Sequence, residues 1–204
     1  MSAPPGGSRR RLDEDRRRAQ IITAAVEVLD EVGYGAATLT RIADCAAVSK
    51  GLIWHYFTGK DDLMTAVAES TLTTLTDGIA DGLDRTAPVP DVLRSALRGA
   101  ADLSRTHRKE LNALNRIVHN LHGPDGTPKM TLAFYETTYQ AQENLFRRGQ
   151  VEGSLRDFDT RVMAVTYQGA VDMMLGYLNE HPETEPRAYA DALADLLLNG
   201  IERS

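Results

Sequence analysis

The sequence of 204 residues has one cysteine, few aromatic side chains and no long hydrophobic run. A single cysteine excludes an internal disulfide and a cluster of thiolate metal ligands, and it fits a reducing cytoplasm. No apolar stretch approaches the roughly 18 residues of a membrane-spanning helix, so we expect a cytoplasmic protein without membrane contact. Positive charge is also in deficit, because 23 Lys and Arg stand against 29 Asp and Glu. The net charge of −6 argues at first against a nucleic-acid partner.

Most of the chain has the residue spacing of amphipathic helices. Apolar residues recur three and four positions apart, and no segment alternates between apolar and polar residues as a half-buried strand does. Gly33 follows the first apolar stripe, where a left-handed residue commonly ends a helix. We predict an all-α protein of about nine helices. The later helices are expected at residues 91–105, 109–121, 129–148, 158–179 and 186–202.

Two short helical patterns follow the first long one. Thr38 can cap the first of them, and Ser49 can cap the second, Lys50–Tyr56. Ala47 and Val48 form the turn between the two, and a small residue stands where the helices would cross. Two short helices joined by a three-residue turn are typical of a helix-turn-helix.

The residues of this segment resemble the DNA-binding signature of the tetracycline-repressor (TetR) family. The matching positions are Thr38, Ile42, Ala43, Val48, Ser49, Lys50, Gly51, His55, Tyr56, Phe57, Lys60 and Leu63, preceded by Gly33 and Tyr34. A second string, Gly149, Gly153, Leu155, Arg156 and Asp159, is similar to the family's link between its seventh and eighth helices.

Two positions depart from the family pattern. Ala47 stands where the family often has Gly, at a cost of about 1 kcal/mol if this residue is left-handed. Trp54 replaces the usual Tyr, which can alter how an operator is recognised. Neither change breaks the expected fold.

The second helix of a helix-turn-helix lies in the major groove with its N-terminal residues at the base edges. Lys50 can reach guanine or a phosphate, Gly51 lets the backbone approach the DNA, and Trp54 and His55 project from the same end. The remaining expected DNA contacts, mostly to phosphates, are Thr38, Thr40, Arg41, Ser49, Tyr56 and Lys60. Core positions are instead expected at Tyr34, Ile42, Val48 and Phe57, and Cys45 at or near the helix surface.

The predicted organisation has three parts. Residues 1–12 form a flexible basic arm, in which Arg9, Arg10 and Arg11 either stay in solution or contact the neighbouring minor groove or backbone. Residues 13–64 form the helix-turn-helix domain, and residues 65–204 form a ligand-binding and dimerisation domain, as the family resemblance implies.

The C-terminal part contains a stripe of large amphipathic residues. Such a stripe suits either a pocket for an aromatic or amphipathic ligand, or a packed core with tyrosine hydroxyls at its rim. The candidate pocket residues are Arg116, His119, Tyr135, Tyr139, Gln142, Phe146 and Met173. His119 and His122 have helical metal-ligand spacing, but no third ligand is evident, so we expect no metal site and no cofactor.

The last two predicted helices, 158–179 and 186–202, carry more apolar residues than one subunit can cover. The resemblance implies that they form a two-fold homodimer interface. The leading hypothesis is a dimeric transcription regulator that binds a palindromic operator and is released by a small-molecule effector. We expect a repressor rather than an activator. The alternative is a DNA-binding regulator that has no small-molecule ligand and is controlled by a protein partner.

An enzyme is not expected, because the sequence contains no nucleophile elbow, phosphate loop or Ser/His/Asp grouping. The negative net charge no longer argues against a DNA partner once the positions of the charged residues are considered. Residues 1–64 hold equal numbers of basic and acidic residues, so the remainder of the chain carries the whole negative excess. We expect weak non-specific affinity for DNA and recognition through a few placed contacts.

Overall fold

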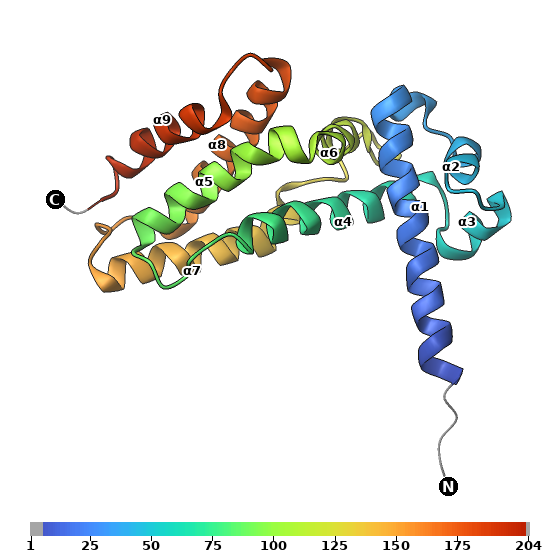
Figure 1. Ribbon diagram of the computed structural model, residues 1–204, viewed down its shortest axis with the longest axis horizontal. Coiled ribbons are helices and arrows are strands. Elements are labelled where there is room, and N and C mark those ends of the chain that lie inside the picture. The colour runs from blue at the N-terminus through green and yellow to red at the C-terminus, as the bar shows by residue number, and fades with distance from the viewer. Residues whose placement is uncertain (1–5, 203–204) are drawn as a thin grey trace, which may run out of the picture. The chain divides into compact units, whose positions relative to one another are not determined.

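The computed structural model describes residues 6–202, with the side chains of residues 6–12 and of Leu132 excepted. Over this range the chain forms nine α-helices and one short 3-10 helix without a strand, which confirms the all-α prediction. The chain divides into two compact units (Figure 1). The first comprises Met1–Thr73 and Asn112–Lys129, and the second comprises Thr74–Leu111 and Met130–Ser204.

The first unit is built on the three N-terminal helices. These are α1 (Gly6–Ala36), α2 (Leu39–Cys45) and α3 (Lys50–Tyr56), to which the start of α4 (Lys60–Ala80) and the end of α6 (Arg108–Asn120) are added. The unit thus extends past the expected boundary at residue 64, because α4 continues through it without a break.

The core of the first unit is the apolar face of α1. Ile21, Ala25 and Leu29 of α1 are fully buried, as are Ile42 of α2 and Ile53 of α3. Burial of each large side chain contributes about 1.5–3 kcal/mol, which is enough to hold helices as short as α2 and α3. Helices of this length are unstable alone, so this packing is what forms the helix-turn-helix.

Helix α1 differs from its prediction at both ends. It begins at Gly6, so residues 6–12, which were assigned to the arm, are helical, as the good helix propensity of Arg and Leu allows. Gly33 has the expected positive φ of 78°, but its ψ of 170° makes the backbone extended, and one further helical turn follows. Residues 1–5 lie outside the described part of the chain.

Two predicted helix caps are confirmed. The Thr38 hydroxyl accepts a hydrogen bond from the Arg41 backbone N–H at 3.2 Å, and the Ser49 hydroxyl accepts one from the Leu52 N–H at 3.2 Å. Each cap satisfies a backbone donor that a helix start leaves free, which contributes about 1 kcal/mol.

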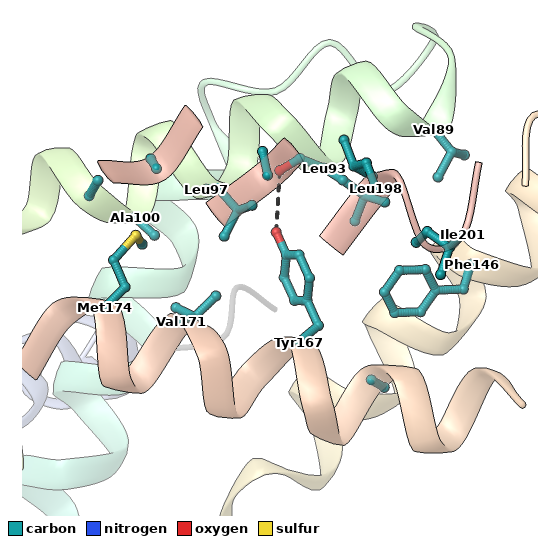
Figure 2. Packing of buried hydrophobic residues seen from close by; sticks show 14 of the residues in the cluster. Val89, Leu93, Leu97, Ala100, Phe146, Tyr167, Val171, Met174, Leu198 and Ile201 are labelled. Carbon is teal, nitrogen blue, oxygen red and sulfur yellow. Dashed lines mark hydrogen bonds between the residues drawn. The ribbon is translucent and has the colours of Figure 1, made fainter. Parts of the chain in front are cut away.

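The second unit consists of α5 (Val89–Thr106), the 3-10 helix η1 (Leu132–Tyr135), α7 (Glu136–Glu152), α8 (Thr160–Glu180) and α9 (Pro186–Leu198), together with the end of α4 and the start of α6. Helix α5 lies against α8 and α9, and α7 packs on α8. In their core, Tyr167 extends from α8 so that its hydroxyl donates to the Leu93 carbonyl of α5 at 3.3 Å (Figure 2). None of the described helices is both long and apolar enough to span a bilayer.

Two helices in the second unit have other bounds than predicted, and the first of them, α7, also ends at Glu152 rather than at residue 148. The helix expected at 129–148 begins only at Glu136, because Lys129 is held in the preceding loop by a hydrogen bond from its N–H to the Leu121 carbonyl. Leu132–Tyr135 is a 3-10 turn, so Tyr135 does not continue the α-helical face of α7. Helix α9 ends at Leu198 rather than at residue 202. The Ile201 carbonyl instead accepts a hydrogen bond from the Arg156 N–H at 2.9 Å.

Candidate nucleic-acid interface

The turn between α2 and α3 is tightly bonded and locally strained. The Val48 N–H donates to the Ala43 carbonyl at 3.0 Å, and the Ala47 N–H donates to the Asp44 carbonyl at 3.1 Å. Ala47 has φ of +51°, the left-handed conformation that its place in the motif implied. A residue with a Cβ costs about 1 kcal/mol there, and the core on both sides compensates for it.

Gln20 of α1 supports this turn. Its amide nitrogen donates to the Ala46 carbonyl at 2.7 Å, and its amide oxygen accepts from Arg17 at 3.0 Å. Gln20 thereby satisfies the carbonyl directly before the strained residue. This contact could not be predicted from the sequence, because a single glutamine on an exposed helix face has no motif around it.

Helix α3 buries one face and exposes the other. Ile53 is fully buried, whereas Lys50, Gly51, Trp54 and His55 are exposed, and Trp54 has 53% of its surface accessible. The structure therefore brings the four expected base-edge residues together on the solvent side of the predicted recognition helix. Tryptophan side chains are usually largely buried, so an indole exposed to this extent is unusual.

Gly51 has no packing role within the described chain. A Cβ built on it would meet only the Ser49 hydroxyl, at 3.8 Å, which is an ordinary contact. Its φ is not positive, so the backbone does not need glycine either. Glycine inside a helix costs about 1 kcal/mol relative to alanine. Packing and backbone conformation in the described part of the chain therefore do not explain glycine at this position.

The expected phosphate-contacting residues lie in two different environments. Thr38, Thr40 and Arg41 are exposed at the start of α2, and Ser49 is exposed before α3, although the Thr38 and Ser49 hydroxyls already serve as caps. Tyr56 is half-buried, and its ring lies edge-on to His55 with centroids 5.0 Å apart.

Lys60 is engaged inside the first unit. Its ammonium donates to the Tyr34 carbonyl at 2.6 Å and lies 4.4 Å from the centre of the Tyr34 ring. Burial lowers the pKa of Lys60, and the nearby Asp61 opposes that shift. One donor of Lys60 therefore ties the end of α1 to the start of α4. Only the other two donors remain for the phosphate contact that the sequence suggested.

Two residues assigned to the core are only half-buried. Tyr34 lies under Lys60 at the surface, and Val48 occupies the turn, where fewer neighbours surround it. Ile42 and Phe57 are buried as predicted, and Cys45 is exposed.

A basic run on α1 was not singled out from the sequence. Arg16, Arg17 and Arg18 are all exposed, and the Arg18 guanidinium lies 5.3 Å from the centre of the Phe57 ring at the end of α3. Three consecutive arginines were the available signal. The side chains of Arg9, Arg10 and Arg11 lie outside the described part, so their predicted contact with DNA stays a prediction.

Comparison with known proteins agrees with this geometry. Residues 21–67 match the family described as "Bacterial regulatory proteins, tetR family". The HTH-type transcriptional regulator BetI 2 of Chromohalobacter salexigens is 49% identical over 67 residues, which are 33% of this chain and 32% of that protein. The HTH-type transcriptional activator FasR of Mycolicibacterium smegmatis is 39% identical over 101 residues, 48% of this chain and 46% of that protein.

The fold agrees over nearly the full length. The solved structure of the fatty acid degradation regulator FadR from Bacillus halodurans superposes with a TM-score of 0.75, covering 97% of each chain at 21% identity. Residues 21–67 of the chain thus carry the N-terminal domain of the TetR family. The matches to BetI 2 and FasR span between a third and a half of the length of those relatives, and both are named as transcriptional regulators rather than as enzymes.

The seven candidate pocket residues are divided between the two compact units. Arg116 and His119 belong to the first unit. The Arg116 guanidinium donates to the Leu29 and Asp30 carbonyls, the latter at 2.9 Å, and so caps the end of the long segment of α1. His119 is exposed, with its Nδ1 2.8 Å from the Asn115 carbonyl. The other five residues belong to the second unit.

Only some of those five lie together. Phe146 is fully buried between Phe158 and Tyr167, with ring centroids 5.8 and 6.0 Å away, so its role is in the core. Met173 is 72% exposed on α8. Tyr135 and Tyr139 are neighbours, with ring centroids 6.1 Å apart.

Gln142, another candidate pocket residue, belongs to a hydrogen-bonded series of polar side chains that was not predicted from the sequence. Its amide nitrogen donates to the Gln168 amide oxygen at 2.8 Å, and the Gln168 amide nitrogen donates to the Asp172 carboxylate at 2.8 Å. Burial raises the pKa of Asp172 to about 6, although the hydrogen bond from Gln168 lowers it. In the part of the chain that the structure describes, no three His, Cys, Asp or Glu residues are placed to hold a metal ion.

Proposed function

We propose that the chain is a DNA-binding transcription regulator that acts in the cytoplasm as a homodimer on a palindromic operator. Gly51 carries this proposal. It is an exposed helix residue whose glycine is not required by packing or by backbone conformation, at the position where a recognition helix faces base edges. Lys50, Trp54 and His55 supply a cation, a large apolar surface and a hydrogen-bonding ring beside it.

The experiment is selection of bound DNA from a random duplex pool, followed by affinity measurement on the selected sequence. We expect a two-fold symmetric sequence with half-sites about 34 Å apart, or a multiple of that distance. Gly51→Ala is expected to raise the free energy of unfolding by about 0.5–1 kcal/mol and to weaken operator binding at least tenfold. Gly78→Ala, on an exposed face of α4 with open space around it, should stabilise without changing binding. Unchanged affinity of Gly51→Ala would contradict the proposed interface.

The homodimer is supported by the apolar surface of the last two helices. Val162, Val165, Met173 and Tyr177 form an exposed stripe on α8, and Leu196 of α9 is 77% exposed. Contiguous apolar side chains of this kind are uncommon on a monomer surface. A partner subunit that packs α8 and α9 against their own copies would bury them.

Control by a small molecule is the third part of the proposal. A ligand releases DNA only if it binds the released state more tightly than the bound state. Helices α4 and α6 each contribute residues to both compact units, so a change in the second unit has two helical routes to the first.

We place repression first, because a bound dimer can block a promoter without any further contact to polymerase. FasR is named as an activator, so activation is the alternative to test. A promoter reporter carrying the selected operator decides between them, since expression falls on addition of a repressor and rises with an activator.

A further inference from the structure

The hydrogen bonds that link Gln142 of α7 to Gln168 and Asp172 of α8 run in one fixed direction. An ionised carboxylate can only accept hydrogen bonds, so Asp172 requires the Gln168 amide nitrogen to face it. The Gln168 amide oxygen then faces Gln142, which must present its own amide nitrogen at 2.8 Å. This order leaves the Gln142 amide oxygen, Oε1, at the other end of the chain.

Gln142 Oε1 is buried and receives no hydrogen bond from any described residue of the chain. An acceptor buried without a donor costs about 1–3 kcal/mol, so native proteins rarely leave one unpaired. Turning the Gln142 amide over would not repair the defect, because it would place two oxygens against each other. The series of hydrogen bonds from Gln142 to Asp172 therefore lacks one donor, at Gln142 Oε1.

The surroundings are rich in negative charge and in aromatic faces. Asp172 forms no ion pair with a Lys, Arg or His among the described side chains. Its charge raises the pKa of both Tyr135 and Tyr139, although burial is the larger cause for each, so the two phenols lie within electrostatic range of the carboxylate.

Arg161 does not neutralise Asp172. Its guanidinium lies 4.8 Å from the centre of the Tyr139 ring, but it is paired with Glu136 at 2.7 Å and with Glu143 at 3.1 Å. Its positive charge is thus matched by Glu136 and by Glu143, which also pairs with Arg147 at 2.5 Å.

We propose that the Tyr135, Tyr139, Gln142 and Asp172 cluster binds an organic cation with N–H donors, such as a protonated amine on an apolar body. The proposal rests on the effector function proposed above and names the chemical class of the effector. An N–H group would supply the donor that Gln142 Oε1 lacks, and the positive charge would complement Asp172. The aromatic faces would add cation–π attraction and bury the apolar part. A carboxylate or phosphate ligand could accept from the tyrosine hydroxyls, but Asp172 would repel it and it would bring no donor to Gln142 Oε1.

The experiment is calorimetric titration of the full-length protein, without DNA, at pH 7.5. The probes are 2-phenylethylammonium and its longer 4-phenylbutylammonium homologue, each compared with its N-trimethyl derivative and with the matched phenylalkanoate. We expect the primary ammonium ions to bind at least tenfold more tightly than the N-trimethyl ions, and the carboxylates not to bind. Absence of binding by both primary ammonium ions, or equal binding of the matched carboxylates, would overturn the proposal and leave a cluster satisfied by solvent only.

Matched variants localise the site. Asp172→Asn removes the charge, and Gln142→Leu removes the acceptor, so each should weaken ammonium binding at least tenfold. The controls are Glu180→Gln on α8 and Gln140→Leu on α7, both exposed on the same two helices. Thermal melting and sedimentation establish that every variant keeps the fold and oligomeric state of the wild type. Equal affinity in Asp172→Asn and the wild type would place the binding site elsewhere.

Operator binding is measured separately with the selected DNA. If the protein binds the operator but no ammonium ion, the inferred ligand class fails and the regulator proposal stands. If an ammonium ion binds at the cluster but does not change operator affinity, the ligand site stands and the release mechanism fails.

Discussion

At the scale of single residues, Ala47 and Gly51 depart from ordinary conformational preference in opposite ways. Ala47 occupies a left-handed conformation that suits glycine, and Gly51 is a glycine inside a helix that alanine would favour. The first cost follows from the tight turn between α2 and α3. The second has no explanation in the described part of the chain, which is why we infer a partner that approaches α3 closely.

The pH dependence of stability also belongs to this scale. Burial raises the pKa of Asp172 to about 6 in the folded chain, from an ordinary value of 3.8. Folding therefore favours the protonated form, and the ionised form destabilises the fold. Asp172→Asn should melt at the same temperature as the wild type below about pH 4. Its advantage should grow between about pH 4 and pH 6 and stay constant above, at about 1 kcal/mol or less because the side chain is partly exposed.

Differential scanning calorimetry at a series of pH values measures this difference. Glu180→Gln is the control, since it removes an exposed acid from the same helix. An Asp172→Asn variant that melts below the wild type at pH 7.5 would show that the ionised carboxylate stabilises the fold, contrary to its raised pKa.

At the scale of elements, the link between α7 and α8 contains residues whose roles are set by local backbone geometry and one whose role is set by tertiary packing. Gly153 has φ of +80° and ends α7 in the left-handed conformation, and the Asp159 carboxylate caps α8 by accepting from the Arg161 and Val162 N–H groups. These roles follow from local geometry. The role of Gly149 does not, because it depends on residues brought close by the fold.

We expect Gly149→Ala to destabilise the protein by about 1–3 kcal/mol, although alanine is the better helix former. A Cβ at this position would lie 2.5 Å from Leu155 Cδ1 and 3.1 Å from Val89 Cβ, and both side chains are buried and cannot move away. Denaturant unfolding measures the change. Gly78→Ala, with open space around it on α4, should shift stability in the opposite direction. Stabilisation by Gly149→Ala would refute the close contact.

A ladder of ion pairs fixes the antiparallel register of α5 and α9. Arg94 pairs with Asp195 at 2.7 Å, Arg98 with Asp191 at 2.6 Å, and Asp102 with Arg187 at 2.8 Å. Exposed pairs contribute little stability each, at about 0–1 kcal/mol. Their order nevertheless disfavours a shift of α9 by one turn, which would place like charges opposite each other.

At the scale of the whole molecule, the exposed apolar stripe on α8 makes dimerisation the property to test. We expect Met173→Glu to shift the protein from dimer to monomer in sedimentation, because a carboxylate would be buried at the interface without a partner. Operator affinity should fall with it, since each subunit contacts only one half-site.

Val151→Glu is the matched control, because Val151 of α7 is 90% exposed and lies outside the stripe. It should sediment and bind DNA as the wild type does. A Met173→Glu variant that remains dimeric and binds the operator normally would place the interface on another surface.

The sequence by itself determined the features that depend on neighbouring residues. Helical periodicity indicated an all-α chain, and the caps at Thr38 and Ser49 followed from their positions in a short motif. Such features are set within one or two turns of backbone, so residue types and spacing are sufficient to predict them. The start of α7 was missed, because the loop contact of Lys129 outweighs the helical periodicity that follows it.

Only the tertiary structure decided which polar groups meet across long stretches of chain. Arg116 had been assigned to a pocket, yet it caps α1, 86 residues away, and Lys60 bonds Tyr34 across 26 residues. The order of Gln142, Gln168 and Asp172 depends on how α7 packs against α8. A buried hydrogen-bonding group takes whichever partner the fold brings within about 3 Å, and residue spacing along the sequence does not encode that partner.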